Sequence, residues 1–284
     1  MESAPIPLPS LVIFDLDGVV YRGEEPVPGA AALVAAIHDA GRVVRFATNN
    51  SMATRQDYVG RLAAQGIHTT AEEIVTSVWA TVEHLRAHQP DVHSVLTVGA
   101  DGMRSELRAA GFDATYAADA APAEWWGEPV SGSYDAVVAG LDPRIEYRTL
   151  GIAAAVIRGG ARFVATNADV RYPMPAGFVP GAGAIIAALR AASGVDPIVI
   201  GKPEPAMFRA ILESCGVPPA EALVIGDNPD ADVVAARRAG IPVALVLTGI
   251  ADQRVADTLE GDRRPDWIAA DPAALAERLG LRLS

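Results

Sequence analysis

The chain has 284 residues and a formal net charge of −12, from 35 acidic and 23 basic side chains. This length allows one large or two ordinary domains, and the acidic surface argues against a nucleic-acid partner. Half of the residues are hydrophobic, yet no apolar run is long enough to span a bilayer, and residues 1–10 show no signal-peptide pattern. The single cysteine, Cys215, cannot form an internal disulfide, and together these features predict a cytoplasmic protein.

Short β-branched runs alternate along the chain with amphipathic segments rich in Ala, Leu and Arg. Predicted strands cover residues 11–14, 43–47, 94–98, 136–139, 162–165, 197–200, 222–225 and 243–247. Predicted helices cover residues 29–40, 55–65, 78–88, 102–110, 147–158, 182–192, 205–214 and 230–239. Because the strands are almost continuously apolar, this alternation predicts an α/β fold with a parallel, Rossmann-like sheet covered on both faces.

Ligands of such sheets bind outside the carboxyl ends of the strands, so polar residues directly after a strand are the first site candidates. Four predicted strands end in this way, at residues 15–18, 48–51, 201–203 and 226–228. About 150 residues separate the second of these segments from the third, and that stretch has its own strand–helix alternation. We therefore expect an inserted domain at residues 78–180 and a core domain formed by residues 1–77 and 181–284.

Asp15 and Asp17 lie two residues apart at the end of the first strand, and Gly18 allows a sharp turn after them. Two carboxylates this close repel each other, so either one is protonated or a cation lies between them. Mg²⁺ is a simple choice for oxygen ligands, and Asp15 could then act as a nucleophile while Asp17 gives and takes a proton. An isolated Asp-x-Asp is also common as a solvated turn.

Lys202 is the one lysine among the 23 basic side chains that Lys and Arg supply. Its compact ammonium is a point charge, unlike the planar fork of arginine, and it suits a site between a phosphate and a carboxylate. Thr48 follows the second strand and offers a hydroxyl to an anionic oxygen, although alone it could be a helix cap. Asp227 follows another buried strand and fits a metal ligand; Asp230 fits a cap, and Asp232 fits either role.

Each of these segments alone is weak evidence for a function, but their order along the chain is specific evidence. Residues 14–23 (FDLDGVVYRG) resemble the first motif of the haloacid dehalogenase-like phosphohydrolase superfamily, and residues 47–51 (ATNNS) resemble the second. Residues 201–205 (GKPEP) and 225–232 (IGDNPDAD) are similar to the third and fourth. The large insert after the second motif indicates the subfamily with a type IIA cap, the NagD-like and 4-nitrophenylphosphatase-like group.

The resemblance implies a magnesium-dependent phosphatase that forms an aspartyl-phosphate on Asp15. It implies that Asp17 protonates the leaving oxygen and then activates water, and that Lys202 neutralises Asp15 and the phosphoryl group. Phosphoryl oxygens would be held by Thr48, Asn49 and Asn50. Mg²⁺ would be held by Asp15, Asp227 and the backbone carbonyl of Asp17, with Asp232 and Asn228 in the outer shell.

Inside the insert, Tyr172 aligns with a substrate-contacting position that is a histidine in some relatives, and Arg171 precedes it. Whether either residue touches a substrate is open, because loop residues carry specificity but also simply pack. Trp125 and Trp126 form an aromatic pair for which core packing is expected, with a lid or a homodimer contact through the insert as alternatives.

The expected partner is a small phosphate ester, with neither nucleic acid nor membrane. Two other functions remain open at this stage: a phosphotransferase or phosphomutase that uses the same aspartyl-phosphate, and a non-catalytic phosphosugar-binding module. Mutases of this superfamily usually carry their cap between the first two motifs, where this chain has no room. A binding module would be expected to lack Asp15, Asp17 or Lys202, and all three are present.

Overall fold

The computed structural model describes residues 6–174 and 177–283, so the first half of the segment judged for a signal peptide lies outside the described residues. The chain divides into two compact units. The core unit comprises Met1–Thr48, Arg55–Val75 and Lys202–Ser284, and the inserted unit comprises Asn49–Thr54 and Thr76–Gly201. Within the described ranges, no helix combines the length and the apolar character needed to cross a membrane.

The core unit is built on a six-stranded sheet with the order β15-β14-β13-β1-β4-β5. Its strands are β1 (Leu11–Asp15), β4 (Val43–Thr48), β5 (Ile74–Thr76), β13 (Ala222–Gly226), β14 (Val243–Val246) and β15 (Trp267–Ala269). β1 pairs in parallel with both β4 and β13, and every residue of β1 and β13 is buried. This burial on both faces explains why these strands read as continuous apolar runs in the sequence.

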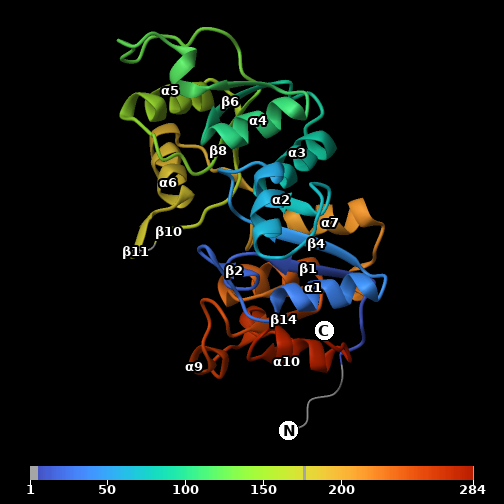
Figure 1. The fold of residues 1–284 in the computed structure, drawn as a ribbon. Helices are drawn as coiled ribbons and strands as arrows, with labels where there is room; N and C mark the ends of the chain where they lie inside the picture. The colour runs from blue at the N-terminus through green and yellow to red at the C-terminus, as the bar shows by residue number, and fades with distance from the viewer. Residues whose placement is uncertain (1–5, 175–176, 284) are drawn as a thin grey trace. The chain divides into compact units, whose positions relative to one another are not determined.

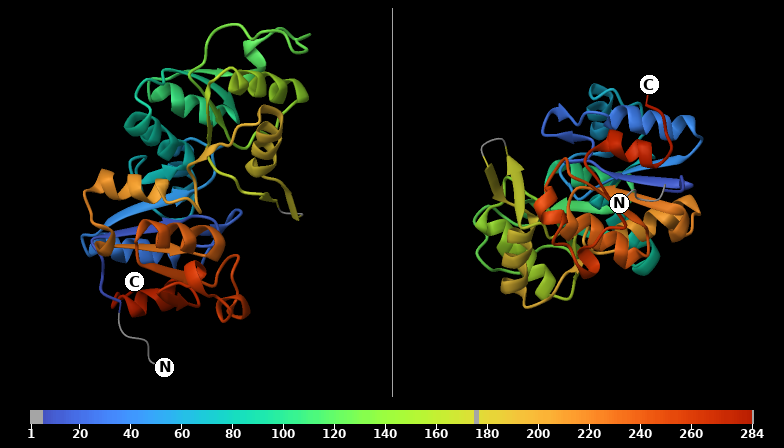
Figure 2. Two further views of the ribbon diagram at one scale, coloured as in Figure 1. Left: turned by 180° about the vertical axis from the view of Figure 1, so that it is seen from behind. Right: turned by 90° about the horizontal axis from the view of Figure 1, so that it is seen from below.

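Helices cover both faces of this sheet (Figures 1 and 2). α1 packs against α10, and α7 packs against α8, which gives the two helical layers. The bounds of the helices in this unit are Ala30–Asp39 for α1, Arg55–Ala64 for α2, Ala206–Cys215 for α7, Val234–Ala239 for α8, Gln253–Ala256 for α9 and Pro272–Arg278 for α10. A short hairpin, β2 (Tyr21–Arg22) and β3 (Glu25–Pro26), follows β1.

The inserted unit has its own five-stranded sheet with the order β12-β9-β8-β6-β7, in which neighbouring strands pair in parallel. The strands are β6 (Ser94–Val98), β7 (Asp113–Tyr116), β8 (Ala136–Ala139), β9 (Arg162–Ala165) and β12 (Ile198–Val199). The helices are α3 (Ser77–His88), α4 (Asp101–Ala109), α5 (Tyr147–Arg158) and α6 (Ala182–Ser193). A separate hairpin joins β10 (Arg171–Met174) to β11 (Gly177–Pro180).

The predicted fold class is confirmed: a parallel α/β core carries an inserted α/β unit. The division of the chain differs from the expected return to the core at residue 181, because α6 lies in the inserted unit. Ile185, Ile186 and Leu189 of α6 are buried in the same hydrophobic cluster as Ile152 and Ile157 of α5. The sequence pattern showed a helix at this place but not the sheet on which it packs.

Candidate active site

The order of the strands in the core sheet brings the predicted site residues to one edge. β1 lies between β13 and β4, with Phe14 opposite Ile225 and Asp15 opposite Ala47. Asp15 is therefore the last residue of β1, Thr48 the last residue of β4, and Asp227 the first residue after β13. Because the three strands run in parallel, these residues emerge at the same edge, where α/β sheets bind their ligands.

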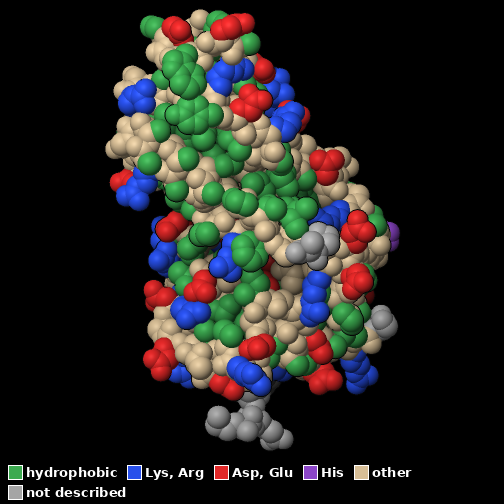
Figure 3. All heavy atoms as spheres, turned by 90° about the vertical axis from the view of Figure 1, so that its left-hand side faces the viewer, with side chains coloured by type: hydrophobic (Ala, Val, Ile, Leu, Met, Phe, Trp, Pro, Cys, Tyr) green, Lys and Arg blue, Asp and Glu red, His purple; other side chains and the backbone are tan. Residues whose placement is uncertain are grey.

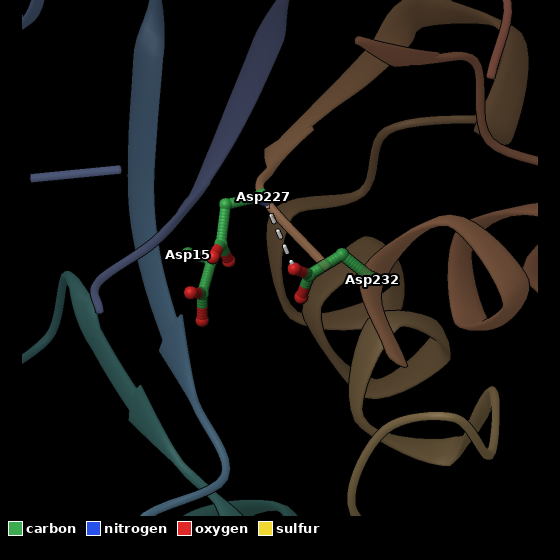
Figure 4. Close-up of side chains that lie close together, drawn as sticks. All are labelled: Asp15, Asp227 and Asp232. Carbon is green, nitrogen blue, oxygen red and sulfur yellow. Dashed lines mark hydrogen bonds between the residues drawn. The ribbon is translucent and has the colours of Figure 1, made fainter. Parts of the chain in front are cut away.

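Three buried carboxylates meet at this edge. Oxygen atoms of Asp15, Asp227 and Asp232 all lie within 4.8 Å of one another, and the three residues expose 9%, 3% and 1% of their surface. Figure 4 shows the carboxyl groups of Asp15 and Asp227 next to each other, with Asp232 facing them from the chain after β13. Among the described residues, no other group of three His, Cys, Asp or Glu side chains has metal-binding spacing.

Lys202 is the cation of this cluster and is itself 3% exposed. Its Nζ donates to Asp15 Oδ1 at 2.5 Å, to Asp232 Oδ1 at 2.7 Å and to the Ala47 carbonyl at 3.2 Å. Burial lowers the pKa of Lys202, but Asp15 and Asp232 raise it, and the net result is a raised pKa. The ammonium is therefore held charged at neutral pH.

The cluster carries more negative than positive charge. Three carboxylates against one ammonium leave an excess of two negative charges when all groups are ionised. Burial raises the pKa of Asp15, with Asp232 and Asp227 adding to the rise and Lys202 opposing it. Burial and the neighbouring Asp232 also raise the pKa of Asp227, to about 7. The excess charge is thus met either by protons or by a divalent cation.

The carboxylate of Asp227 lies in a narrow space between two glycines. Its Oδ2 accepts a hydrogen bond from the backbone N–H of Ile250 at 2.6 Å. A Cβ atom on Gly249 would lie 1.9 Å from this oxygen, and one on Gly18 would lie 2.4 Å from it. Gly18 also has a φ of +83°, as expected for a sharp turn after the Asp pair.

The loop after β14 is a part of the site that sequence reasoning missed. Besides Ile250 and Gly249, it contributes Thr248, whose hydroxyl donates to the Gly18 carbonyl at 2.6 Å. The signal was available, because Thr248 and Gly249 directly follow a predicted strand, as the other four polar segments do. Thr248 and Gly249 carry no charge, so their side chains did not mark this loop as part of a site.

Asp232 connects Lys202 to the backbone that follows β13. One oxygen accepts from Lys202, and the other accepts from the backbone N–H groups of Asp227 at 3.3 Å and Asn228 at 3.1 Å. Asn228 caps the following π-helical turn, η3 (Pro229–Val233), by accepting from the N–H of Asp230 at 3.0 Å. The capping role expected for Asp230 thus belongs to Asn228, while Asp230 pairs with Arg263 at 2.7 Å.

Asp17 lies in the loop after β1 and, unlike Asp15, it is exposed. Its carboxylate is not one of the three in the acid cluster. Partial desolvation of its carboxyl group raises the pKa of Asp17, while the charges of Arg61 and Lys202 lower it. A carboxyl with a raised pKa keeps its proton more readily at neutral pH, as a general acid must.

The other residues predicted to bind substrate divide between the units. Thr48 belongs to the core unit and is 3% exposed, whereas Asn49, Asn50 and Tyr172 belong to the inserted unit. The side-chain nitrogen of Asn49 lies 3.1 Å from both carboxylate oxygens of Asp169. Asn50 Oδ1 accepts from the N–H of Met52 at 2.8 Å, so both amide side chains take part in local structure. Tyr172 is half-buried on the hairpin strand β10.

The two adjacent tryptophans have different environments. Trp125 packs against the hydrophobic cluster of the inserted unit, and its Nε1 donates to the Glu128 carbonyl at 2.7 Å. Trp126 is 78% exposed and stacks on Tyr147, with ring centroids 5.8 Å apart. Core packing is therefore confirmed for Trp125 and wrong for Trp126. Hydrophobic side chains reach the surface over the upper part of Figure 3, where this unit is drawn.

Comparison with known proteins assigns the chain to a family. A model described as haloacid dehalogenase-like hydrolase matches residues 12–113, and one described as HAD-hydrolase-like matches residues 199–275. The 5'-nucleotidase YutF of Bacillus subtilis is 32% identical over 262 residues, which cover 90% of this chain and 96% of that protein.

Two solved structures extend the similarity to the fold. The glycerol phosphate phosphatase of Mycobacterium tuberculosis, in complex with magnesium, has a TM-score of 0.82 at 33% identity and covers 94% of this chain and 76% of that one. NagD from E. coli K-12 has a TM-score of 0.80 at 32% identity, and the match covers 93% of this chain and 97% of NagD. The chain therefore belongs to the haloacid dehalogenase-like hydrolases, in the NagD-like branch that carries a type IIA cap.

Proposed function

We propose that this protein is a magnesium-dependent phosphatase that hydrolyses a small phosphomonoester through an aspartyl-phosphate on Asp15. The observation that carries the proposal is the buried contact of 2.5 Å between Asp15 Oδ1 and Lys202 Nζ, at the end of the central strand. A carboxylate held there by an ammonium ion, beside two further acids, is placed to act as a nucleophile toward an electrophilic phosphorus.

The reaction has two steps. In the first, an oxygen of Asp15 bonds to phosphorus, the bond to the leaving oxygen breaks, and Asp17 gives its proton to that oxygen. In the second, Asp17 takes a proton from water as the water oxygen attacks phosphorus, which releases inorganic phosphate and restores Asp15. The exposure of Asp17 and its raised pKa support this proton-transfer role, because it can meet both a leaving group and a water molecule.

Stabilisation of the phosphoryl group is assigned to Lys202 and to the end of β4. Lys202 contacts Asp15 and the Ala47 carbonyl directly, so its charge lies beside the attacking carboxylate. Thr48 follows Ala47 and is assigned to a phosphoryl oxygen through its hydroxyl and the neighbouring N–H groups. Fixed donors of this kind contribute most where charge develops in the transition state.

The residues present fit a magnesium ion. The donors are hard carboxylate oxygens, the cluster has two unbalanced negative charges, and Gly18 and Gly249 let the backbone approach Asp227 more closely than a residue with a Cβ atom could. We assign Asp15, Asp227 and the backbone carbonyl of Asp17 as ligands, with Asp232 and Asn228 supporting them from the outer shell. When bound, the ion would neutralise the site and polarise the phosphoryl group.

The substrate is proposed only as a class. Relatives carry the names 5'-nucleotidase and glycerol phosphate phosphatase, which share a phosphomonoester and differ in the alcohol. Specificity is therefore assigned to the inserted unit, with Tyr172 and its neighbour Arg171 as candidates. Fold similarity alone does not identify the alcohol.

Release of inorganic phosphate from a panel of phosphate esters, with Mg²⁺ and with EDTA, tests the proposal. We expect Mg²⁺-dependent release that Asp15→Asn abolishes while the circular dichroism spectrum stays unchanged. Substantial turnover by Asp15→Asn would refute the nucleophile assignment. Transfer of phosphate to an added alcohol without release to water would instead support a phosphotransferase.

We also propose that the protein forms a homodimer through the inserted unit, with Trp126 and Tyr147 at the contact. Both side chains are more than three-quarters exposed, at 78% and 77%, and exposed aromatic pairs are common at interfaces. Sedimentation should give the mass of a dimer for the wild type and a monomer for Trp126→Ser. A monomeric wild type would reject this part of the proposal.

A further inference from the structure

Arg61 of α2 and Gln65, the residue directly after this helix, hold the turn of the β2–β3 hairpin by its backbone. Arg61 donates from Nη2 to the Gly23 carbonyl at 2.6 Å, and Gln65 donates from Nε2 to the Glu24 carbonyl at 3.0 Å. Arg61 lies in the last turn of α2, and Gln65 lies in the turn that ends the helix, where its N–H donates to the Leu62 carbonyl at 3.0 Å. We call this pair of contacts the α2 clamp.

Arg61 makes a second contact with the same segment. Its guanidinium carbon lies 3.9 Å from the centre of the Tyr21 ring, within cation–π distance. Tyr21 is fully buried, and within the described part of the chain its hydroxyl has no hydrogen-bond partner. The ring is therefore positioned by packing and by Arg61, not by a hydrogen bond of its own.

Tyr21 in turn closes the loop that carries Asp17. The Tyr21 carbonyl accepts from the N–H of Gly18 at 2.7 Å, and Asp17 forms a β-bridge with Tyr21. The N–H groups of Val20 and Tyr21 both reach back to the Leu16 carbonyl, at 2.9 and 3.2 Å. A continuous set of contacts thus runs from α2 through Tyr21 to Asp17.

We propose that Arg61, supported by Gln65, is a positioning residue that fixes the Asp17 loop so that the Asp17 carboxyl reaches the leaving oxygen of the substrate. This inference rests on the proposed phosphatase reaction. Arg61 acts through Tyr21 and the hairpin, whereas the proton itself moves from Asp17 to the departing alkoxide as the phosphorus–oxygen bond breaks. Freezing a loop in its productive geometry avoids the loss of rate that a displacement of about 1 Å can cause.

The dependence of the rate on the leaving group separates this role from a general loss of structure. A leaving group such as 4-nitrophenolate departs without protonation, whereas a more basic phenolate needs a proton from the acid. The ratio kcat/KM includes steps only up to release of the alcohol, so it isolates the step in which Asp17 acts as an acid. A misplaced Asp17 should therefore slow basic leaving groups selectively.

The experiment measures kcat/KM with Mg²⁺ for a series of substituted phenyl phosphates, from 4-nitrophenyl phosphate to phenyl phosphate. For Arg61→Ala we expect a loss of less than about threefold on 4-nitrophenyl phosphate and of roughly tenfold or more on phenyl phosphate. Gln65→Ala should also lose more kcat/KM on phenyl phosphate than on 4-nitrophenyl phosphate, but by a smaller factor than Arg61→Ala. If Arg61→Ala does not fold, Gln65→Ala still carries the test.

Arg278→Ala is the matched control, because Arg278 also donates to a backbone carbonyl, that of Ile268 at 2.8 Å, but at the edge of the core sheet near β15. Its dependence on the leaving group should equal that of the wild type. An equal loss on all esters for Arg61→Ala and Gln65→Ala, or no loss, would overturn the positioning role. A wild type inactive on every ester would overturn the proposed function itself, and the role of the clamp with it.

Discussion

Lys202 occupies a position that fits a lysine and not an arginine. Its Nζ donates to Asp15, Asp232 and the Ala47 carbonyl, and only 3% of the residue is exposed. A planar guanidinium is larger and directs its donors in a fixed fork. The side chain therefore cannot be exchanged for another cation without moving Asp15.

We expect Lys202→Arg to lower kcat by roughly 100-fold or more in spite of the unchanged charge. The guanidinium displaces the charge from its position beside Asp15, and loss of one fixed stabilising group in a transition state costs about this much. Steady-state kinetics on 4-nitrophenyl phosphate would measure the loss, and a thermal melt would verify the fold. Near-normal activity would contradict the steric argument. Lys202→Met, which removes the charge with similar length, provides the comparison.

Asp227 makes the stability of the magnesium-free protein depend on pH. Its pKa in the folded state is about 7, above the ordinary value of 3.8, so between these values the folded state binds more protons than the unfolded state. Stability then falls as pH rises through this window, by an amount on the order of a few kcal/mol. We expect the Tm measured in EDTA to fall between about pH 4 and pH 7.

Two comparisons check this prediction. Asp227→Asn, which cannot ionise, should show a smaller fall in Tm over the same range. Mg²⁺ should raise the Tm of the wild type most strongly at the high end of the range, where the carboxylate is ionised. The prediction fails if the wild type and Asp227→Asn lose stability in parallel.

At this scale the sequence predicted the residues better than their contacts. Asp15 and Asp227 each follow a predicted strand, and the parallel pairing of β1 with β13 brings the ends of these two strands together. Lys202 also follows a predicted strand, but that strand is β12 of the inserted sheet, so strand pairing in the core does not explain its position. The direct ion pair of Asp232 with Lys202 could not be predicted, because it depends on the turn of η3. The pattern of apolar residues in 230–239 predicts an ordinary helix there.

At the scale of elements, the loop after β14 supports the Asp227 carboxylate through the close approach of its backbone. A Cβ on Gly249 would lie 1.9 Å from Asp227 Oδ2, nearer than any real contact, so Gly249→Ala must displace that carboxylate or the loop. We expect a rise of roughly tenfold or more in the Mg²⁺ concentration needed for half-maximal activity, as is typical when support of a ligand is lost. Titration of activity with Mg²⁺ measures it.

Gly60→Ala is a suitable control, since Gly60 lies in α2 and a Cβ there meets nothing within 4 Å. It should leave the Mg²⁺ requirement unchanged. An unchanged requirement in Gly249→Ala as well would show that the loop moves away without disturbing Asp227.

The central strands were predictable, and most of the edge strands were not, although β12 lies within the predicted strand 197–200. β6, β8 and β9 have the predicted bounds, because long apolar runs in buried strands leave little ambiguity. β5 and β15, with three residues each, and the strands of the two hairpins were missed. Short edge strands are defined by a neighbour across the sheet and carry little periodicity of their own.

For the whole molecule, the division of the chain is set by tertiary packing. The segment Thr76–Gly201 of the inserted unit has its own parallel sheet and its own hydrophobic cluster. α6 completes that cluster with Ile185, Ile186 and Leu189, of which Leu189 is fully buried. Full burial of such side chains contributes about 1.5–3 kcal/mol each, which is a large share of the stability of a domain.

We therefore expect a fragment of residues 76–201 to fold alone, with a cooperative thermal transition followed by circular dichroism. A fragment of residues 78–180, which ends before α6, should lack this transition, because the face of α5 that carries Ile152 and Ile157 would be uncovered. Replacing Leu189 by Ala in the longer fragment is the intermediate case and should lower its Tm, since buried Leu→Ala substitutions cost about 2–5 kcal/mol. Equal cooperative melting of the two fragments would contradict the assignment of α6 to the inserted unit, and would favour a boundary at residue 181.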